Sequence, residues 1–294
     1  MRITLEAFAK VNRSLVVFGR RPDGYHEIDT LFQTIDLSDE IRFEEDGALS
    51  LSVGGIDLVE GEANLVLRAA HALSAGAGVI RGARIHLSKR IPVGAGLGGG
   101  SADAAATLLG LNSLWRFETT ADDLAAIGAT VGSDIPFFLY GGRARGTGRG
   151  ERIEPLPDAP DERLVLLFPG FGMATPEVYR ALGAGPAPDP LPPRVDSSAV
   201  PDRNDLEAAA ERLRPELASL RLALLAEGAL SARLSGSGST VYGVFRGDDE
   251  ARRAAAAIGR KESVQTLVTR SLSRAEWCRR ALPPGGRDPE VGKP

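Results

Sequence analysis

The residues best suited to do chemistry lie in one short glycine-rich run. Residues 92–106 read PVGAGLGGGSADAAA, with five glycines among the seven residues Gly94–Gly100. Glycine adopts positive φ angles readily and lets a ligand approach the backbone closely. An alanine-rich helical pattern follows at once, and the N–H groups and dipole of a first helical turn attract anions. The run therefore predicts a phosphate ligand.

Three other interpretations of this run can be weighed against a phosphate loop. Gly94–Gly99 is a formal G-x-G-x-x-G, but a Rossmann site needs a second parallel strand ending in an acid about 20 residues on. The acid at that distance, Glu118, lies in a polar connection between two expected helices. A Walker loop needs lysine where Gly100 stands. A glycine-rich turn without a ligand is disfavoured, because so many glycines cost backbone entropy on folding.

Length and composition limit the classes of protein to which the chain can belong. With 294 residues, 43% hydrophobic and 25% charged, it has the composition of a soluble globular protein of one large or two ordinary domains. The net charge of −4 argues against a nucleic-acid partner, which would require clustered Lys and Arg. A single cysteine, Cys278, excludes an intrachain disulfide and a cysteine-cluster metal site. No signal segment or membrane-spanning run is visible, so we expect a cytoplasmic protein without a membrane partner.

The elements that must position the glycine run predict an α+β fold in two parts. In the first part, short apolar patterns predict strands over 3–5, 15–18, 41–45, 49–53 and 83–89. Helical spacing predicts helices over 64–77, 101–114 and 121–131. We expect Ser101 to cap the second of these helices and Asp103 to lie in its first turn. The segment Pro155–Asp161 is the expected boundary between the two parts.

The second part predicts a β-α-α-β-β-α-β order, which is typical of a ferredoxin-like domain. Its expected strands span 163–168, 230–234, 240–245 and 264–269, and its expected helices span 176–182, 206–213, 215–227 and 249–258. We expect domains over residues 1–157 and 162–282. The six prolines of residues 183–202 predict an irregular surface excursion, and residues 283–294 a disordered tail.

The glycine run resembles the P-x-x-x-G-L-G-S/G-S-A/S motif of the GHMP kinases. Two further segments resemble the other motifs of that family, in the same order: AKVN at Ala9–Asn12 and LSGSGST at Leu234–Thr240. The resemblance implies an ATP-binding N-terminal domain similar to ribosomal protein S5 domain 2. It also implies a ferredoxin-like C-terminal domain, with ATP and substrate meeting between the two.

Other segments narrow the resemblance to one branch of these kinases. Residues 21–28 read RPDGYHEI, residues 31–33 read LFQ, and residues 131–137 read VGSDIPF. They resemble the branch that acts on a cytidine diphosphate derivative of methylerythritol in the non-mevalonate isoprenoid pathway. The resemblance implies that ATP phosphorylates the 2-hydroxyl of that small molecule. Mg²⁺ is expected on the ATP phosphates, where it keeps several waters and needs few protein ligands.

Carried over residue by residue, the resemblance implies two catalytic side chains. Asp134 would take the proton of the hydroxyl as general base. The alternative is that Asp134 only caps the turn before Pro136, a common use of aspartate. Lys10 would lie beside Asp134, keep it ionised and orient the hydroxyl or the transferring phosphate. Lysine is ordinarily a solvated surface residue, which is the alternative for Lys10.

The remaining site residues divide between the two substrates. Tyr25 is expected to stack on the cytosine, His26 to reach its hydrogen-bonding edge and Tyr179 to close its other face, although a lone histidine is more often ordinary core or surface. Asn12 resembles a substrate-contacting position. Asn64 and Lys89 resemble positions lining the adenine pocket. The residues expected around the ATP phosphates are Pro92, Val93, Gly94, Ala95, Gly96, Leu97, Gly98, Gly99, Gly100, Ser101 and Ala102. Neither the metal ligands nor the oligomeric state can be assigned from the sequence.

Two alternative functions stay open at this point. Another GHMP kinase, such as a homoserine kinase, would have no need of the DGYH and LFQ segments. A noncatalytic nucleotide- or RNA-binding protein on the same S5-like scaffold would carry a basic face and no Lys10–Asp134 pair.

Overall fold

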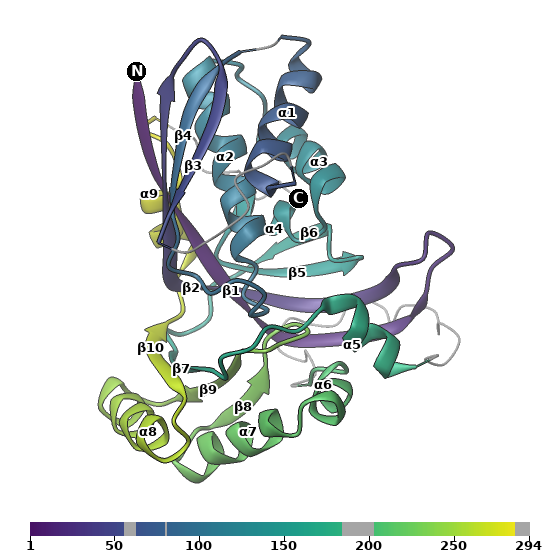
Figure 1. The fold of residues 1–294 in the computed structure, drawn as a ribbon, viewed down its shortest axis with the longest axis vertical. Coiled ribbons are helices and arrows are strands. Elements are labelled where there is room, and N and C mark those ends of the chain that lie inside the picture. The colour runs from purple at the N-terminus through teal and green to yellow at the C-terminus, as the bar shows by residue number, and fades with distance from the viewer. Residues whose placement is uncertain (56–62, 80, 184–202, 286–294) are drawn as a thin grey trace.

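Two β-sheets, each covered by helices on one face, form the molecule (Figure 1). The computed structural model describes residues 1–55, 63–79, 81–183 and 203–285. The strands of the first sheet are β1 (Arg2–Arg20), β2 (His26–Glu45), β3 (Leu49–Gly54), β4 (Ala83–Ser88), β5 (Arg143–Gly148) and β6 (Arg152–Leu156). The long strand β2 pairs with β1, with β4 through residues 40–45 and with β5 through residues 28–33. Among the described strands, only β3 and β4 pair in parallel.

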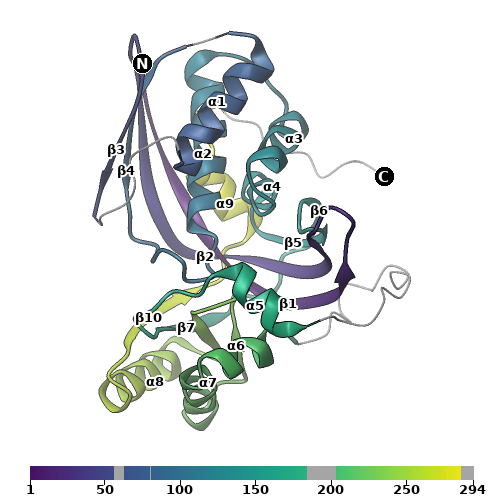
Figure 2. The same ribbon diagram turned by 45° about the vertical axis from the view of Figure 1, so that its right-hand side comes forward.

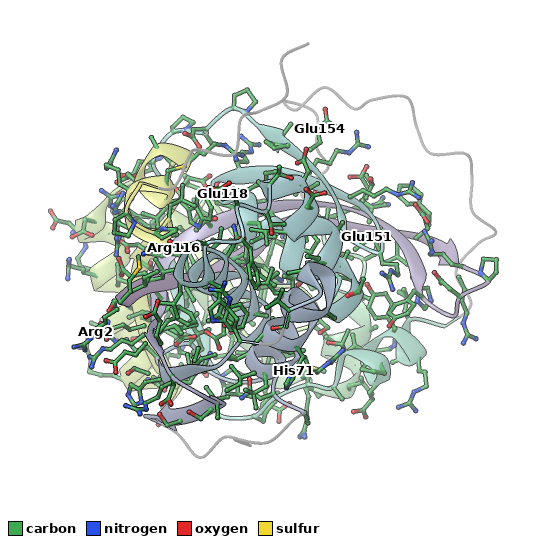
Figure 3. All side chains as sticks on the ribbon, turned by 90° about the horizontal axis from the view of Figure 1, so that it is seen from above. Arg2, His71, Arg116, Glu118, Glu151 and Glu154 are labelled. Carbon is green, nitrogen blue, oxygen red and sulfur yellow. The ribbon has the colours of Figure 1, made fainter. Side chains whose placement is uncertain are left out.

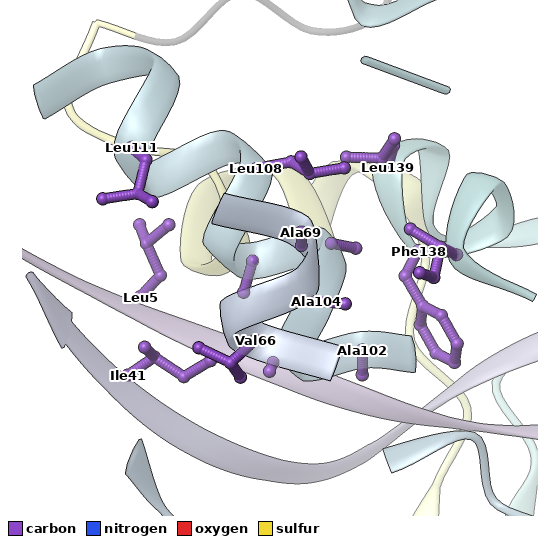
Figure 4. Close-up of a cluster of buried hydrophobic side chains, with 14 of the residues drawn as sticks. Leu5, Ile41, Val66, Ala69, Ala102, Ala104, Leu108, Leu111, Phe138 and Leu139 are labelled. Carbon is purple, nitrogen blue, oxygen red and sulfur yellow. The ribbon is translucent and has the colours of Figure 1, made fainter. Parts of the chain in front are cut away.

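Four helices cover one face of the first sheet, as both ribbon views show (Figures 1 and 2). They are α1 (Leu65–Ala77), α2 (Gly99–Trp115), α3 (Ala121–Val131) and α4 (Ile135–Tyr140). Leu5 and Ile41 of the sheet pack in one apolar cluster with Val66 of α1, Leu108 of α2 and Phe138 of α4 (Figure 4). Small residues let α2 lie close to the sheet, since a Cβ at Gly110 would come 2.4 Å from the Phe43 ring. The helix that follows the glycine run is therefore buried at the centre of this layer.

The second sheet has the strand order β10-β7-β9-β8 with every pair antiparallel, which confirms the ferredoxin-like order. Its strands are β7 (Arg163–Phe168), β8 (Ser231–Leu234), β9 (Val241–Phe245) and β10 (Gln265–Arg270). The helices of this part are α5 (Thr175–Leu182), α6 (Glu207–Leu213), α7 (Glu216–Ala226) and α8 (Asp248–Lys261). The last helix, α9 (Arg274–Ala281), returns to pack against β1 of the first sheet.

An apolar layer joins the two sheets and fixes the glycine run between them. Strand β7 reads RLVLLF, and its side chains alternate between the two faces of the sheet. Val165 and Leu167 belong to the cluster under the helices of the second part. Leu164, Leu166 and Phe168 instead pack in a cluster with β1, β2 and residues 91–97. Because β7 is buried on both faces, the loop before α2 is held against the second sheet.

The structure corrects several expected elements of the first part. The strands expected over 3–5 and 15–18 are one strand, β1, with register shifts between Phe8 and Lys10 and between Asn12 and Ser14. The sequence between the two expected strands hid this continuity because Lys10 and Asn12, both buried, interrupt the apolar pattern. Helices α4 and α9, strands β5 and β6 and residues 26–40 of β2 were also missed.

The connection after α2 excludes the Rossmann alternative. No strand lies between α2 and α3 in this described segment, and α3 follows after only a few residues. Glu118 is exposed at positive φ (+55°) and lies near Arg116 in this connection (Figure 3). The helices of the described residues are too short or too polar for any of them to cross a membrane. Residues 184–202 and 286–294, which hold most of the expected excursion and tail, lie outside the described residues.

Candidate active site

A cleft of about 1480 Å³ runs between the two sheets and gathers the predicted site residues. Its walls come from β1, the β1–β2 hairpin, the glycine run, the start of α4 and helix α5. All the predicted site residues line it except Ala102. Ala102 is buried, and its amide donates a hydrogen bond to the Gly98 carbonyl within the helix start.

The carbonyl groups of the glycine run are engaged by hydrogen bonds from the protein. Every carbonyl oxygen from residue 94 to residue 98 accepts a hydrogen bond from the protein. The Met173 amide donates to the carbonyl of residue 94 (3.4 Å) and the Thr240 amide to that of residue 95 (3.1 Å). The carbonyl of residue 96 accepts from Lys10 Nζ (3.0 Å) and Ser235 Oγ (2.9 Å). The Lys10 amide donates to the carbonyl of residue 97 (3.0 Å), and the Ala102 amide to that of residue 98 (2.9 Å). In a planar trans peptide the N–H points opposite to the C=O. The amides of residues 95–99 therefore point away from these donors, in a stretch that lines the cleft, which suits an anion site.

Helix α2 begins earlier than the sequence suggested. Gly98 is the N-cap, with φ +72°, and Gly99 is the first helical residue. The prediction that Ser101 caps this helix is wrong, because Ser101 already lies in its first turn. The prediction that Asp103 lies in the first turn is also wrong. The early start adds the amides of residues 99–101, which have no partner within the helix, to the amides of the loop.

Lys10 and Asp134 face each other at the base of the cleft. Lys10 Nζ lies 3.7 Å from Asp134 Oδ2, and the lysine side chain is only 4% exposed against 35% for the aspartate. Asp134 holds the N-cap position of α4 but makes no side-chain capping hydrogen bond. Its carboxylate is therefore directed at Lys10 and the cleft, and the interpretation of Asp134 as a mere capping residue fails.

The Lys10 ammonium is held in place by neutral acceptors. It donates to Asn12 Oδ1 at 2.6 Å and to the Gly96 carbonyl at 3.0 Å. Asn12 is buried, and its Nδ2 donates to Thr30 Oγ1 at 2.7 Å, which fixes the orientation of the amide. Burial lowers the pKa of Lys10 below its usual value, and the Asp134 carboxylate opposes this shift. Asn12 thus touches Lys10 directly, a contact that the sequence did not suggest.

The aromatic residues expected around a pyrimidine gather at one end of the cleft. His26 and Tyr179 stack on each other with ring centroids 4.7 Å apart and an interplanar angle of 22°. Tyr25 is 53% exposed, and the Arg149 guanidinium lies over its ring at 4.7 Å from the centroid. Burial and the nearby Arg20 lower the pKa of His26 below its usual value, which favours the neutral imidazole. The assignment of these side chains to a cytosine remains a prediction.

Sequence reasoning missed three arginines that line the cleft at this end. Arg20, Arg149 and Arg180 line the cleft beside Tyr25, His26 and Tyr179. Arg149 precedes Gly150, where a Cβ would lie 3.6 Å from Asp134 Oδ1, so this turn also borders Asp134. Nothing in the pattern marks these three among 35 Lys and Arg residues, because only the fold brings them together.

The two residues predicted for the adenine pocket have local partners. Asn64 caps α1, its Oδ1 accepting from the Val66 amide at 3.0 Å. The Lys89 ammonium is buried between Asp39 and Asp103 and donates to both. Lys89 can therefore meet a nucleotide through its backbone or its carbon chain. Within the described part of the chain, no three His, Cys, Asp or Glu side chains group closely enough to hold a metal ion.

The turn between β8 and β9 completes the cleft from the second sheet. A Cβ at Gly236 would lie 3.3 Å from Asn12 Oδ1 and 3.4 Å from Lys10 Nζ, so only glycine fits against the pair. Ser237 Oγ and Thr175 Oγ1 lie 2.8 Å apart at the start of α5. The motif at residues 234–240 thus lies beside the motif at residues 9–12.

Comparisons with known proteins agree with this architecture. The family model described as GHMP kinases N terminal domain matches residues 64–142, and that described as GHMP kinases C terminal matches residues 195–264. The 4-diphosphocytidyl-2-C-methyl-D-erythritol kinase of Pelotomaculum thermopropionicum is 44% identical over 285 residues, 93% of this chain and 99% of the relative.

Solved structures give the same result. A crystal structure of 4-(cytidine 5'-diphospho)-2C-methyl-D-erythritol kinase is 42% identical, has a TM-score of 0.76 and covers 91% of this chain and 98% of that one. A homoserine kinase from Cytophaga hutchinsonii, 19% identical with a TM-score of 0.67, shares the fold over 92% of this chain and 95% of its own. With both family models matched and a relative aligned over nearly the full length of both chains, the chain belongs to the GHMP kinases.

Proposed function

We propose that the protein is an ATP-dependent kinase that phosphorylates 4-diphosphocytidyl-2-C-methyl-D-erythritol on its 2-hydroxyl group. The observation that carries the proposal is the Lys10–Asp134 pair, 3.7 Å apart, in the same cleft as the glycine run. Relatives more than 40% identical over most of the chain bear the name of this kinase.

The proposed reaction is a transfer of the γ-phosphoryl group of ATP to the acceptor hydroxyl. The hydroxyl oxygen forms a bond to phosphorus, the bond from phosphorus to the β,γ-bridging oxygen breaks, and ADP leaves. Asp134 accepts the hydroxyl proton as the new bond forms. Lys10 stays charged, neutralises the carboxylate and the transferring group, and is oriented by Asn12.

The glycine run holds the triphosphate through backbone amides and the N-terminus of α2. A magnesium ion carried by ATP supplies further charge neutralisation on the phosphate oxygens. Because such an ion keeps several waters and few protein ligands, it is compatible with a cleft whose described residues hold no acidic cluster.

The end of the cleft that these aromatic side chains line suits a pyrimidine nucleotide better than an amino acid. Tyr25, His26 and Tyr179 offer aromatic faces, and Arg20 and Arg180 offer positive charge for a diphosphate. Base stacking on aromatic side chains is worth about 1–3 kcal/mol per base. Homoserine has neither an aromatic base nor a phosphate, so this end of the cleft would be superfluous in a homoserine kinase.

The proposal is tested by an acceptor panel with one matched pair of variants. Formation of ADP is measured with the cytidine diphosphate acceptor, with homoserine and with mevalonate, for the wild type, Asp134→Asn and Asp249→Asn. We expect turnover with the first acceptor only. Asp134→Asn should lower kcat by about 10²–10⁴-fold, the usual contribution of a general base.

The control variant makes the same chemical change at an exposed carboxylate. Asp249 lies in the first turn of α8, outside the cleft, so Asp249→Asn should keep wild-type kcat. Turnover of homoserine in place of the cytidine diphosphate compound would overturn the proposed acceptor. Wild-type kcat in Asp134→Asn would overturn the proposed base.

A further inference from the structure

The middle residue of the LFQ segment, Phe32, lies against the reacting lysine. It belongs to β2, opposite Asn12 of β1, lines the cleft and is 1% exposed. Lys10 Nζ lies over the face of its ring, 5.6 Å from the centroid. A cation within about 6 Å of a ring centroid is attracted by the negative potential of the ring face. The reaction as proposed above gives this ring no role.

The Phe32 ring is held from several sides. Phe137 of α4 packs on it, with centroids 4.8 Å apart and an interplanar angle of 32°. On β5, a Cβ at Gly146 would lie 2.5 Å from Phe32 Cε2, so this strand lies directly against the edge of the ring. A Cβ at Gly150 would lie 3.8 Å from Phe32 Cζ and 3.6 Å from Asp134 Oδ1. The ring is therefore fixed between Lys10 and the turn that borders Asp134.

The other neighbours of the Lys10 ammonium are one carboxylate and uncharged groups. Asp134 of α4 supplies negative charge at 3.7 Å, while Asn12 Oδ1 and the Gly96 carbonyl accept hydrogen bonds. From the β8–β9 turn, Gly236 contributes backbone. Burial lowers the pKa of Lys10, and the Asp134 carboxylate opposes this shift. Lys10 therefore depends on Asp134 for charge compensation, and Asp134 loses its charge when it takes up a proton.

We infer that Phe32 is a further positioning residue, whose ring face keeps the Lys10 ammonium charged and in place while Asp134 accepts the proton of the acceptor hydroxyl. The inference rests on the proposed function for the identity of the reacting groups. As the proton reaches Asp134, the negative charge beside Lys10 is neutralised and the hydroxyl oxygen bonds to phosphorus. A ring face does not titrate, so its attraction for the ammonium persists through this step. A second carboxylate in its place would repel the phosphates.

Stepwise fluorination of the ring tests the inference. Fluorine withdraws electron density from the ring face and changes the size of the ring little, so mono-, di- and trifluorinated phenylalanine at position 32 weaken the attraction in steps. The pKa of Lys10 is measured in the free enzyme by NMR titration of isotopically labelled lysine, and kcat and KM by steady-state kinetics. We expect the pKa of Lys10 to fall at each step, because the charged form loses stabilisation. We expect kcat to fall by about tenfold over the series, with little change in KM for ATP.

The control makes the same changes at a second buried phenylalanine. Phe43 of β2 belongs to the same apolar cluster as Phe32, packs against Gly110 of α2 and does not line the cleft. Fluorination of Phe43 should leave the pKa of Lys10 and kcat at their wild-type values. Phe32→Leu and Phe43→Leu should both lower Tm, because each leaves a cavity in the core. Only Phe32→Leu should also lower the pKa of Lys10, and it should reduce kcat by about tenfold or more.

Two results would overturn the inference. One is a pKa of Lys10 and a kcat that stay constant across the fluorinated series at Phe32. The other is an equal loss of kcat in the matched Phe43 variants, which would mean that Phe32 serves only the stability of the core. Because the pKa of Lys10 is measured without ATP or acceptor, failure of the proposed acceptor would be seen separately, as absent turnover in the wild type.

Discussion

The Lys10 ammonium contacts the Asn12 side chain more closely than it contacts the Asp134 carboxylate. Its ammonium lies 2.6 Å from Asn12 Oδ1 and 3.7 Å from Asp134 Oδ2. Asn12 in turn is fixed by Thr30, whose hydroxyl donates to the Ser14 carbonyl at 2.7 Å and so must accept from Asn12. The position of the Lys10 ammonium is thus set by a chain of hydrogen bonds to neutral groups within β1 and β2.

Removal of Asn12 should therefore affect the chemical step more than binding. A hydrogen bond to a charged group contributes about 1.5–3 kcal/mol, so Asn12→Ala should lower kcat about 10- to 100-fold with little change in KM for ATP. Thr30→Val, which removes the partner of Asn12, should lower kcat in the same direction. Thr30→Ser keeps the hydroxyl and should behave as the wild type. Steady-state kinetics check this, and a pure KM effect in Asn12→Ala would contradict the role in positioning Lys10.

At the scale of the elements, the glycine run works because its conformation and its contacts both exclude a side chain. Gly98 combines a φ of +72° with a position where a Cβ would lie 2.6 Å from the Phe138 ring and 3.2 Å from Lys10 Cε. Gly100, two residues on, has ordinary helical geometry, and the nearest atom to its Cβ position is Leu65 Cδ1 at 3.3 Å. The two glycines therefore make a matched pair for substitution.

Gly98→Ala should damage the site, whereas Gly100→Ala should not. A left-handed conformation costs a non-glycine residue about 1–2 kcal/mol, and the contact with Phe138 adds to that cost. We expect Gly98→Ala to lower Tm by several degrees and to raise KM for ATP at least tenfold, because the loop amides shift with the helix start. Gly100→Ala requires only a small movement of the flexible Leu65 side chain. Equal KM values for the two variants would show that the shape of the loop does not depend on Gly98.

Local signals made some elements of the site predictable and left others invisible. The ferredoxin-like order followed from period-2 and period-3.6 patterns, because each strand of that part is short and bounded by turns. The apolar pattern did not predict strand β1 as one continuous strand, because Lys10 and Asn12 are polar yet buried at its centre. The motifs placed the glycine run, Lys10 and Asp134 in one cleft. The contacts of Lys89 with Asp39 and Asp103 and the position of Arg149 could not be found this way, because the partners lie on different elements and no spacing in the sequence relates them.

At the scale of the whole molecule, the position of Lys10 depends on contacts that cross from one sheet to the other. Leu15 of β1 exchanges backbone hydrogen bonds with Arg203 (2.8 Å) and Asp205 (2.9 Å), and the Tyr242 hydroxyl of β9 donates to the Asn12 carbonyl at 2.8 Å. Between them, Asn204 is buried and its Nδ2 donates to the carbonyls of Leu234 and Gly236, at 2.9 and 2.7 Å. Gly236 lies against Lys10 and Asn12. Asn204 therefore links the fold of the second part to the geometry of the reacting groups.

Replacement of Asn204 should consequently lower both the free energy of unfolding and kcat. A second asparagine, Asn112, provides a control that distinguishes these two effects. Asn204→Ala leaves two buried carbonyls without their donor, which should lower the free energy of unfolding by about 1–3 kcal/mol. Because the turn at Gly236 then loosens against Lys10, kcat should fall as well, even well below Tm.

Asn112 likewise bonds the backbone twice, both times to Thr119 at 3.1 Å, but in the connection from α2 to α3, outside the cleft. Asn112→Ala should lose similar stability in thermal unfolding and keep wild-type kcat. If kcat fell in both variants in proportion to the loss of stability, the second sheet would only support the fold. If kcat fell in Asn204→Ala alone, the turn at Gly236 would help to position Lys10.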